Sequence, residues 1–232
     1  MKRWLKRTIQ IFGVFAILLS LLLSYAYFIE PRQFVIIEET ISVPNWSKQL
    51  DGLRIVTIAD IHTGSNYAPR ERVRFVVEQA NAQNADVIVL LGDYVSEAKW
   101  DRGCVRKREA EGDCTELRIP FDEIAEDLKG LKAKYGVYAV IGNHDWYHNE
   151  KKAKRLLDEM AGIRVLNNEI AEVKINEETL RIWGIEDWYL NRRVPTEAFD
   201  ALEEKKNIIV ITHNPDTILS TSRPGQRIFR NN

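Results

Sequence analysis

The sequence predicts an α/β fold, a mixed β-sheet sandwich flanked by helices and preceded by one N-terminal transmembrane helix. Two observations support this prediction. Short apolar runs typical of buried strands alternate along the chain with segments of helical periodicity, an order that favours a mixed or parallel sheet covered by helices. A single long apolar stretch dominates the first 30 residues instead.

The N-terminus has the pattern of a membrane anchor. Basic residues occupy four of the first seven positions, and the uncharged stretch from Thr8 to Ile29 follows. Its apolar core, Ile11 to Phe28, would rise about 27 Å as a helix, close to the thickness of the hydrocarbon layer. The basic flank predicts a cytoplasmic N-terminus and an extracytoplasmic remainder of the chain, held in the cell membrane by a single pass. A cleaved signal peptide is the alternative, since Ser24-Tyr25-Ala26 offers a small-x-small site.

We therefore expect an anchor over residues 1–30 and a folded domain over residues 31–232. Hydrophobic residues make up 45% and charged residues 29% of the chain, which disfavours disorder. Four of the 33 basic residues belong to the N-terminal flank, so the rest carries 29 basic against 34 acidic residues. Domains that bind nucleic acid usually have a basic surface, so we expect no nucleic acid as partner. The sequence leaves the oligomeric state open.

Strands and helices are predicted in turn along this domain. The expected strands are the apolar or alternating segments Phe34–Val43, Arg54–Ala59, Val87–Leu91, Gly136–Ile141, Ile208–Ile211 and several shorter ones within Val165–Ile185. The expected helices are the segments with one apolar face, Arg70–Gln83, Phe121–Lys132, Lys151–Met160 and Thr196–Glu204. Ligands of such sheets bind at the carboxyl ends of the strands.

The polar stretch from Ser96 to Arg118 shows no apolar periodicity, so we expect a loop there. It contains both cysteines of the chain, Cys104 and Cys114. In an oxidising compartment they would form a disulfide that closes the loop. Two unrelated free thiols are the alternative.

Residues suited to metal binding follow four of the apolar runs. They are found in Asp60-Ile61-His62, Gly92-Asp93, Gly142-Asn143-His144-Asp145 and Thr212-His213. Alternate residues of an extended chain face the same side, so Asp60 and His62 can hold one ion together. Asp93 can offer its two oxygens to two ions. Oxygen and nitrogen ligands without a thiolate favour manganese, iron or zinc.

Two divalent ions bring four positive charges, whereas Asp60 and Asp93 supply two negative ones. The site would therefore stay positive, which suits a phosphate ester and a bound hydroxide. His144 can then protonate the leaving oxygen as a general acid. Asp145 can orient the ring of His144, and capping of an exposed helix is the alternative for this residue. The pattern as a whole predicts a metal-dependent phosphoesterase.

In this order the motifs resemble those of the calcineurin-like metallophosphoesterases, and with the N-terminal anchor they resemble the bacterial membrane-associated branch. The resemblance implies that Asp60 and His62 bind a first divalent ion. It also implies that Asn143 and His213 bind a second ion and that Asp93 bridges the two. His144 is by resemblance the catalytic histidine.

The resemblance implies hydrolysis of a phosphomonoester, a phosphodiester or a pyrophosphate. The membrane anchor would favour a membrane lipid or a nucleotide-sugar lipid as substrate. One departure limits this expectation: the family pattern ends in Gly-His-x-His, and the corresponding region, Thr221 to Asn232, contains no histidine. We therefore expect a C-terminally incomplete domain. A membrane-tethered metal-binding domain with little or no turnover is the alternative to a phosphoric ester hydrolase.

Overall fold

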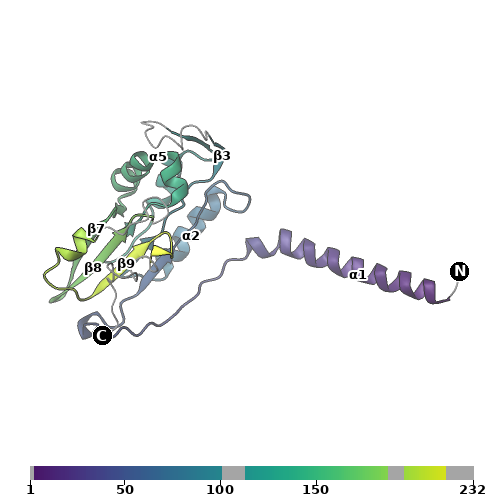
Figure 1. Ribbon diagram of the computed structural model, residues 1–232, viewed down its shortest axis with the longest axis horizontal. Helices are drawn as coiled ribbons and strands as arrows, with labels where there is room; N and C mark the ends of the chain where they lie inside the picture. The colour runs from purple at the N-terminus through teal and green to yellow at the C-terminus, as the bar shows by residue number, and fades with distance from the viewer. Residues whose placement is uncertain (1–2, 101–112, 188–195, 218–232) are drawn as a thin grey trace. The chain divides into compact units, whose positions relative to one another are not determined.

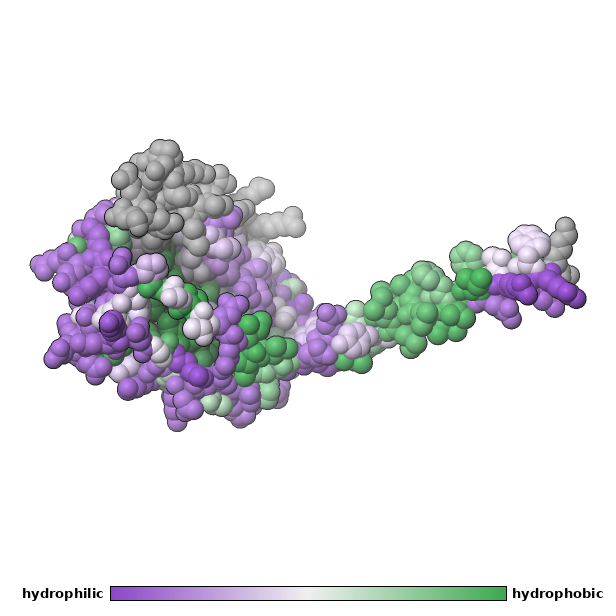
Figure 2. Space-filling view, turned by 90° about the horizontal axis from the view of Figure 1, so that it is seen from below, coloured by the Kyte–Doolittle hydropathy of each residue, from purple (hydrophilic) through white to green (hydrophobic). Residues whose placement is uncertain are grey.

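The computed structural model describes residues 3–100, 113–187 and 196–217, and it divides the chain into two units, Met1–Ser42 and Val43–Asn232 (Figure 1). The first unit contains α1 (Arg3–Phe28), which has no buried residue, and the 3-10 turn Glu30–Arg32. The helical segment Arg3–Arg32 is long and apolar enough to cross a membrane. Figure 2 shows its apolar stretch as a continuous green surface with hydrophilic residues at the N-terminal end. A signal sequence has the same properties, so anchor and cleaved leader both remain predictions.

The described part of the second unit contains three sheets, of which a parallel and a mixed sheet form its core and a two-stranded sheet lies apart from them. The parallel sheet has the strand order β1 (Ile55–Ile58), β2 (Val87–Leu90), β5 (Val137–Ala139) and β6 (Arg164–Val165). The mixed sheet has the order β7 (Glu169–Ile175), β8 (Glu178–Ile185) and β9 (Ile208–Thr212). In this sheet β7 runs antiparallel and β9 parallel to β8.

The alternating side chains of β2 connect the layers. Val87 and Val89 pack in the core between the sheets, together with residues of β7 and β8. Ile88 and Leu90 pack on the other side against the helices, which are α2 (Arg70–Ala82), α4 (Phe121–Leu128) and α5 (Asn143–Arg155). Successive strand residues point to opposite faces, so helices cover one face of the parallel sheet and the mixed sheet covers the other. The expected sandwich flanked by helices is confirmed.

Two expectations are wrong, and each for a physical reason. Residues 34–43 form no strand, and Val35 is 72% exposed; an alternating segment becomes a strand only where a neighbour accepts its backbone hydrogen bonds. The stretch 96–118 contains the antiparallel strands β3 (Glu97–Trp100) and β4 (Thr115–Leu117). Most of the residues of these two strands are exposed or half-buried, which leaves no apolar alternation to detect.

The helix expected from Lys151 begins at Asn143. Asn149 breaks its regularity with φ −170° and ψ 94°, and a π-helical segment, Leu156–Ala161, follows it. The helices expected at 121–132 and 196–204 are shorter, ending at Leu128 and spanning Glu197–Asp200 (α7). Cys114 is disulfide-bonded. Cys104 lies outside the described residues, so the pairing of the two cysteines stays a prediction.

Candidate metal centre

The loops after β1 and β2 are joined by backbone hydrogen bonds. The Asp60 N–H donates to the carbonyl of Gly92 at 3.1 Å, and the His62 N–H donates to the carbonyl of Asp93 at 2.9 Å. Asp60, His62 and Asp93 all have positive φ angles, of 52°, 44° and 58°. This left-handed conformation is unfavourable for side chains other than glycine and often marks functional positions. The three strained residues are the expected ligands of these two loops.

The loop after β5 contacts the loop after β2 where Gly142 meets Gly92. A Cβ atom on Gly92, which has φ 92°, would overlap the backbone of Gly142. A Cβ atom on Gly142 would in turn overlap Asp93. The residue type at both positions is therefore dictated by backbone contact, and this contact carries the Asn143-His144-Asp145 segment to Asp93.

Asp145 is fully buried and holds the loops together. Its carboxylate accepts hydrogen bonds from the backbone N–H groups of Asp93, Tyr94, Val95 and Gly142, at 2.8 to 3.2 Å. Burial, and after it the nearby Asp93 carboxylate, raise the pKa of Asp145 to about 7, although the hydrogen bonds from the backbone N–H groups act in the opposite direction. Asp145 thus caps its own helix, but from a buried position, and it shapes the loop that carries Asp93.

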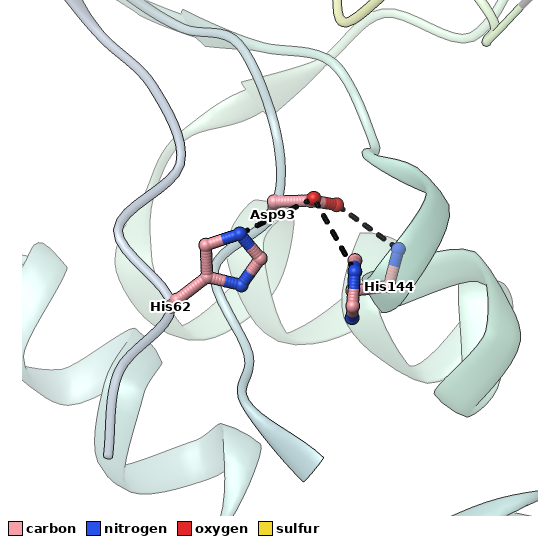
Figure 3. A group of neighbouring side chains, drawn as sticks. All are labelled: His62, Asp93 and His144. Carbon is pink, nitrogen blue, oxygen red and sulfur yellow. Dashed lines mark hydrogen bonds and ion pairs between the residues drawn. The ribbon is translucent and has the colours of Figure 1, made fainter. Parts of the chain in front are cut away.

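The side chains of the expected ligands converge on the Asp93 carboxylate. Its Oδ2 lies 3.5 Å from Nε2 of His62, 4.0 Å from Nε2 of His144 and 3.4 Å from Nε2 of His213 (Figure 3 shows the first two). Among the described residues, two groups have ligand atoms close enough for an ion, His62–Asp93–His144 and Asp60–Asp93–His213. Asp93 belongs to both, as a bridging carboxylate would.

Two histidines of the cluster are oriented by backbone carbonyls. Nδ1 of His62 lies 3.1 Å from the carbonyl of Val95, and Nδ1 of His213 lies 2.8 Å from the carbonyl of Leu91. A carbonyl only accepts, so Nδ1 donates to it, and Nε2 is the ring nitrogen that faces Asp93. A backbone carbonyl on the far nitrogen is the usual arrangement of metal-binding histidines.

Asn143 and Asp60 complete the two sides of the cluster. The Oδ1 atom of Asn143 lies 3.1 Å from Nε2 of His213, and an oxygen of Asp60 lies 3.9 Å from Nε2 of His62. Asp60 is exposed, with 60% of its side chain accessible, whereas the Asp93 side chain is 4% exposed. A pocket of about 450 Å³ opens beside them, lined by Asp60, Asn143, Asp187, His213, Asn214 and Pro215.

Glu97, which no motif indicates, contacts His144. The Nδ1–H of His144 donates to the Glu97 carboxylate, with 2.9 Å to each oxygen. This hydrogen bond raises the pKa of His144, and burial lowers it to a lesser extent. The contact expected from Asp145 to the ring is thus made by Glu97. Glu97 lies in a stretch without apolar periodicity, so the sequence gave no indication of its role. The sequence also gave no indication of Asp187, which lines the pocket just after β8.

Comparisons with known proteins match the chain to one family. The model of the calcineurin-like phosphoesterase family matches residues 53–230. An uncharacterized metallophosphoesterase of Bacillus subtilis, YkoQ, is 31% identical over 172 residues, which are 72% of this chain and 55% of that protein. A transmembrane protein with a metallophosphoesterase domain from Danio rerio is 29% identical over 191 residues, 78% of this chain and 39% of that protein.

A further relative is a UDP-2,3-diacylglucosamine pyrophosphatase of Chlamydia trachomatis, LpxG. It is 23% identical over 250 residues, 88% of this chain and 70% of that protein. The chain spans about half or less of the length of the first two relatives.

Proposed function

This chain belongs to the calcineurin-like phosphoesterase family, and we propose on that basis that it hydrolyses phosphate esters with divalent metal ions as cofactors. One observation supports this proposal most directly. The Nε2 atoms of two histidines face the buried Asp93 carboxylate while their Nδ1 atoms are held by backbone carbonyls, the usual arrangement of metal-binding histidines. The donor set of carboxylate, amide and imidazole, with no thiolate, fits manganese, iron or zinc.

Asp60 and His62 would hold one ion, Asn143 and His213 a second, and Asp93 would contact both. When bound, such ions supply positive charge that polarises the phosphoryl oxygens and lowers the pKa of water. The protein contributes the fixed positions of these ligands. The far nitrogens of both histidines are anchored to backbone carbonyls, so neither ring needs to reorganise during the reaction.

His144 would act as the general acid. Its Nδ1 donates to Glu97, so its Nε2 is the atom that can deliver a proton to the leaving oxygen. The hydrogen bond to Glu97 raises the pKa of His144 and keeps the ring protonated to higher pH. Nε2 of His144 lies 4.0 Å from Oδ2 of Asp93. The proton would therefore be held close to the ions that would bind the phosphoryl group.

We place the reaction at a membrane surface, on the extracytoplasmic side. The apolar helix α1 supports membrane attachment, and the basic residues before it support a cytoplasmic N-terminus. One relative is named a transmembrane protein and another a pyrophosphatase of a diacylated nucleotide sugar. A lipid-linked phosphate ester or pyrophosphate is therefore our proposed substrate class, with residues 31–232 as the catalytic part.

The test is hydrolysis of bis(4-nitrophenyl) phosphate and 4-nitrophenyl phosphate by the purified full chain with Mn²⁺, Zn²⁺ or Fe²⁺. We expect activity that a chelator abolishes and that the metal restores. Asp93→Asn should lower turnover at least about 100-fold, whereas Asp122→Asn, on the exposed face of α4, should leave it unchanged. Metal binding without hydrolysis of either ester would refute the enzyme and favour a tethered metal-binding domain.

A further inference from the structure

The hairpin of β3 and β4 contacts both His144 and helix α5, and it follows the loop that carries Asp93. It carries Glu97, the partner of His144, at one end of β3 and Trp100 at the other, where Trp100 pairs with Thr115. The Thr115 side chain hydrogen-bonds at 3.0 Å to the ring of His148, a residue of α5 that is 3% exposed. In Figure 1, β3 and α5 lie side by side at one end of the unit. Trp100 is therefore held beside the metal centre by packed structure.

Two aromatic residues border His144 on this side. The ring centroid of Trp100 lies 5.7 Å from that of His144 and 5.5 Å from that of Tyr147, at interplanar angles of 76° and 60°. Such edge contacts are favourable arrangements of aromatic rings. Trp100 nevertheless remains 43% exposed. We call Trp100 and Tyr147 the aromatic ledge.

The exposed apolar surface at the ledge is small, and the opposite face of the hairpin is charged. The residue before Trp100, Lys99, forms an ion pair at 2.9 Å with Glu116 on the neighbouring strand, and both side chains are mostly exposed. In the described residues from Pro44 onward, the large hydrophobic residues that are exposed are Phe75 and Trp100. Surfaces that enter membranes or bind proteins expose contiguous apolar patches. A single exposed ring suits contact with one flat group instead.

We propose that the aromatic ledge stacks against a ring carried by the leaving group of the substrate, which makes nucleotides and related ring-bearing phosphate esters the preferred substrates. The inference rests on the proposed function and narrows its substrate class to esters whose leaving group carries a nucleotide or a similar ring. His144 is the residue next to the leaving oxygen, so the group attached to that oxygen extends toward the ring in contact with His144. Nucleobases stack on tryptophan whatever their identity, because each has a flat π-face.

The test compares two ligands that share a phosphate and a sugar but differ in the base. The Mn²⁺-loaded full chain is titrated with uridine 5′-monophosphate and with ribose 5-phosphate, by calorimetry. We expect the nucleotide to bind about 10-fold more tightly, the ratio that one stacked base provides. Trp100→Ala should bring the ratio to about 1 and leave the affinity for ribose 5-phosphate unchanged. Trp100→Phe should keep most of the ratio, and Phe75→Ala, the matched exposed aromatic on α2, should keep all of it.

Equal affinities in the wild type would overturn the proposal. So would a Trp100→Ala variant that loses both ligands equally, because the ring would then only support the hairpin. Failure of the proposed function is read separately, from hydrolysis of bis(4-nitrophenyl) phosphate. If the wild type binds neither phosphate ligand, the protein is titrated with uridine alone. Uridine should then quench the indole fluorescence of the wild type more than that of Trp100→Phe. Equal quenching would refute stacking on the aromatic ledge.

Discussion

Replacing Asp145 with alanine removes the acceptor on which four backbone N–H groups of the metal loops depend. Each buried donor left without a partner costs about 1–3 kcal/mol. Water can enter the space of the lost carboxylate and recover part of this, so we expect the free energy of unfolding to fall by about 4 kcal/mol, the lower end of the sum over four donors. Asp145→Asn keeps one carbonyl oxygen and should cost less, about 2 kcal/mol.

The loss should also depend on pH, in a direction set by the raised pKa of Asp145. A pKa of about 7 in the folded protein lies above that of an unfolded aspartate, about 4. The folded state therefore favours the protonated acid. The stability contributed by this group is fully present below pH 4 and is lost as the pH rises through 7, up to about 4 kcal/mol in all. Asp145→Asn cannot titrate, so the gap between wild type and variant should be larger at pH 5 than at pH 8.

The assay is urea unfolding of metal-free protein, followed by tryptophan fluorescence at pH 5 and pH 8. Asp122, an exposed aspartate in the first turn of α4, provides the control. Asp122→Ala should change the free energy of unfolding by less than about 0.5 kcal/mol. A loss below about 1 kcal/mol for Asp145→Ala, or a gap between Asp145→Asn and wild type that is the same at both pH values, would refute this account of the loops.

Three further predictions concern the partner of His144, the contact of two glycines and the topology of the chain. Glu97→Gln should lower the pKa of His144, so the fall in turnover at alkaline pH should shift to lower pH; an unshifted pH–rate profile would show that Glu97 does not support the acid. Gly92→Ala forces a Cβ atom into the backbone of Gly142 and should cost several kcal/mol, roughly 3 or more by urea unfolding. Gly52→Ala, with φ 77° and open space around it, should cost only about 1 kcal/mol, and equal losses would contradict the overlap. A reporter that works only outside the cytoplasm, fused after residue 232, should be active, and activity of cytoplasmic reporters alone would reverse the topology.

The sequence by itself determined the fold class and where to look for the metal ligands. Apolar runs of strand length mark the central strands, since β1, β2, β5 and β9 lie within or close to the expected segments. Polar residues after such runs meet because parallel strands end at the same edge of a sheet. The Asp93 carboxylate indeed lies at the centre of the other expected ligands, Asp60, His62, Asn143 and His213. Their roles as ligands stay predictions until metal binding is measured.

Only the tertiary structure decided how these residues are held. The partner of His144 is Glu97 rather than Asp145, and Asp145 is buried under the backbone of another loop. The far nitrogens of His62 and His213 meet carbonyls 33 and 122 residues away in sequence. These contacts leave no local signal, because each depends on two segments whose proximity is set by sheet order and by the close approach of two glycines. Periodicity reports which face of an element is apolar, whereas the pairing of buried polar groups is settled by long-range packing.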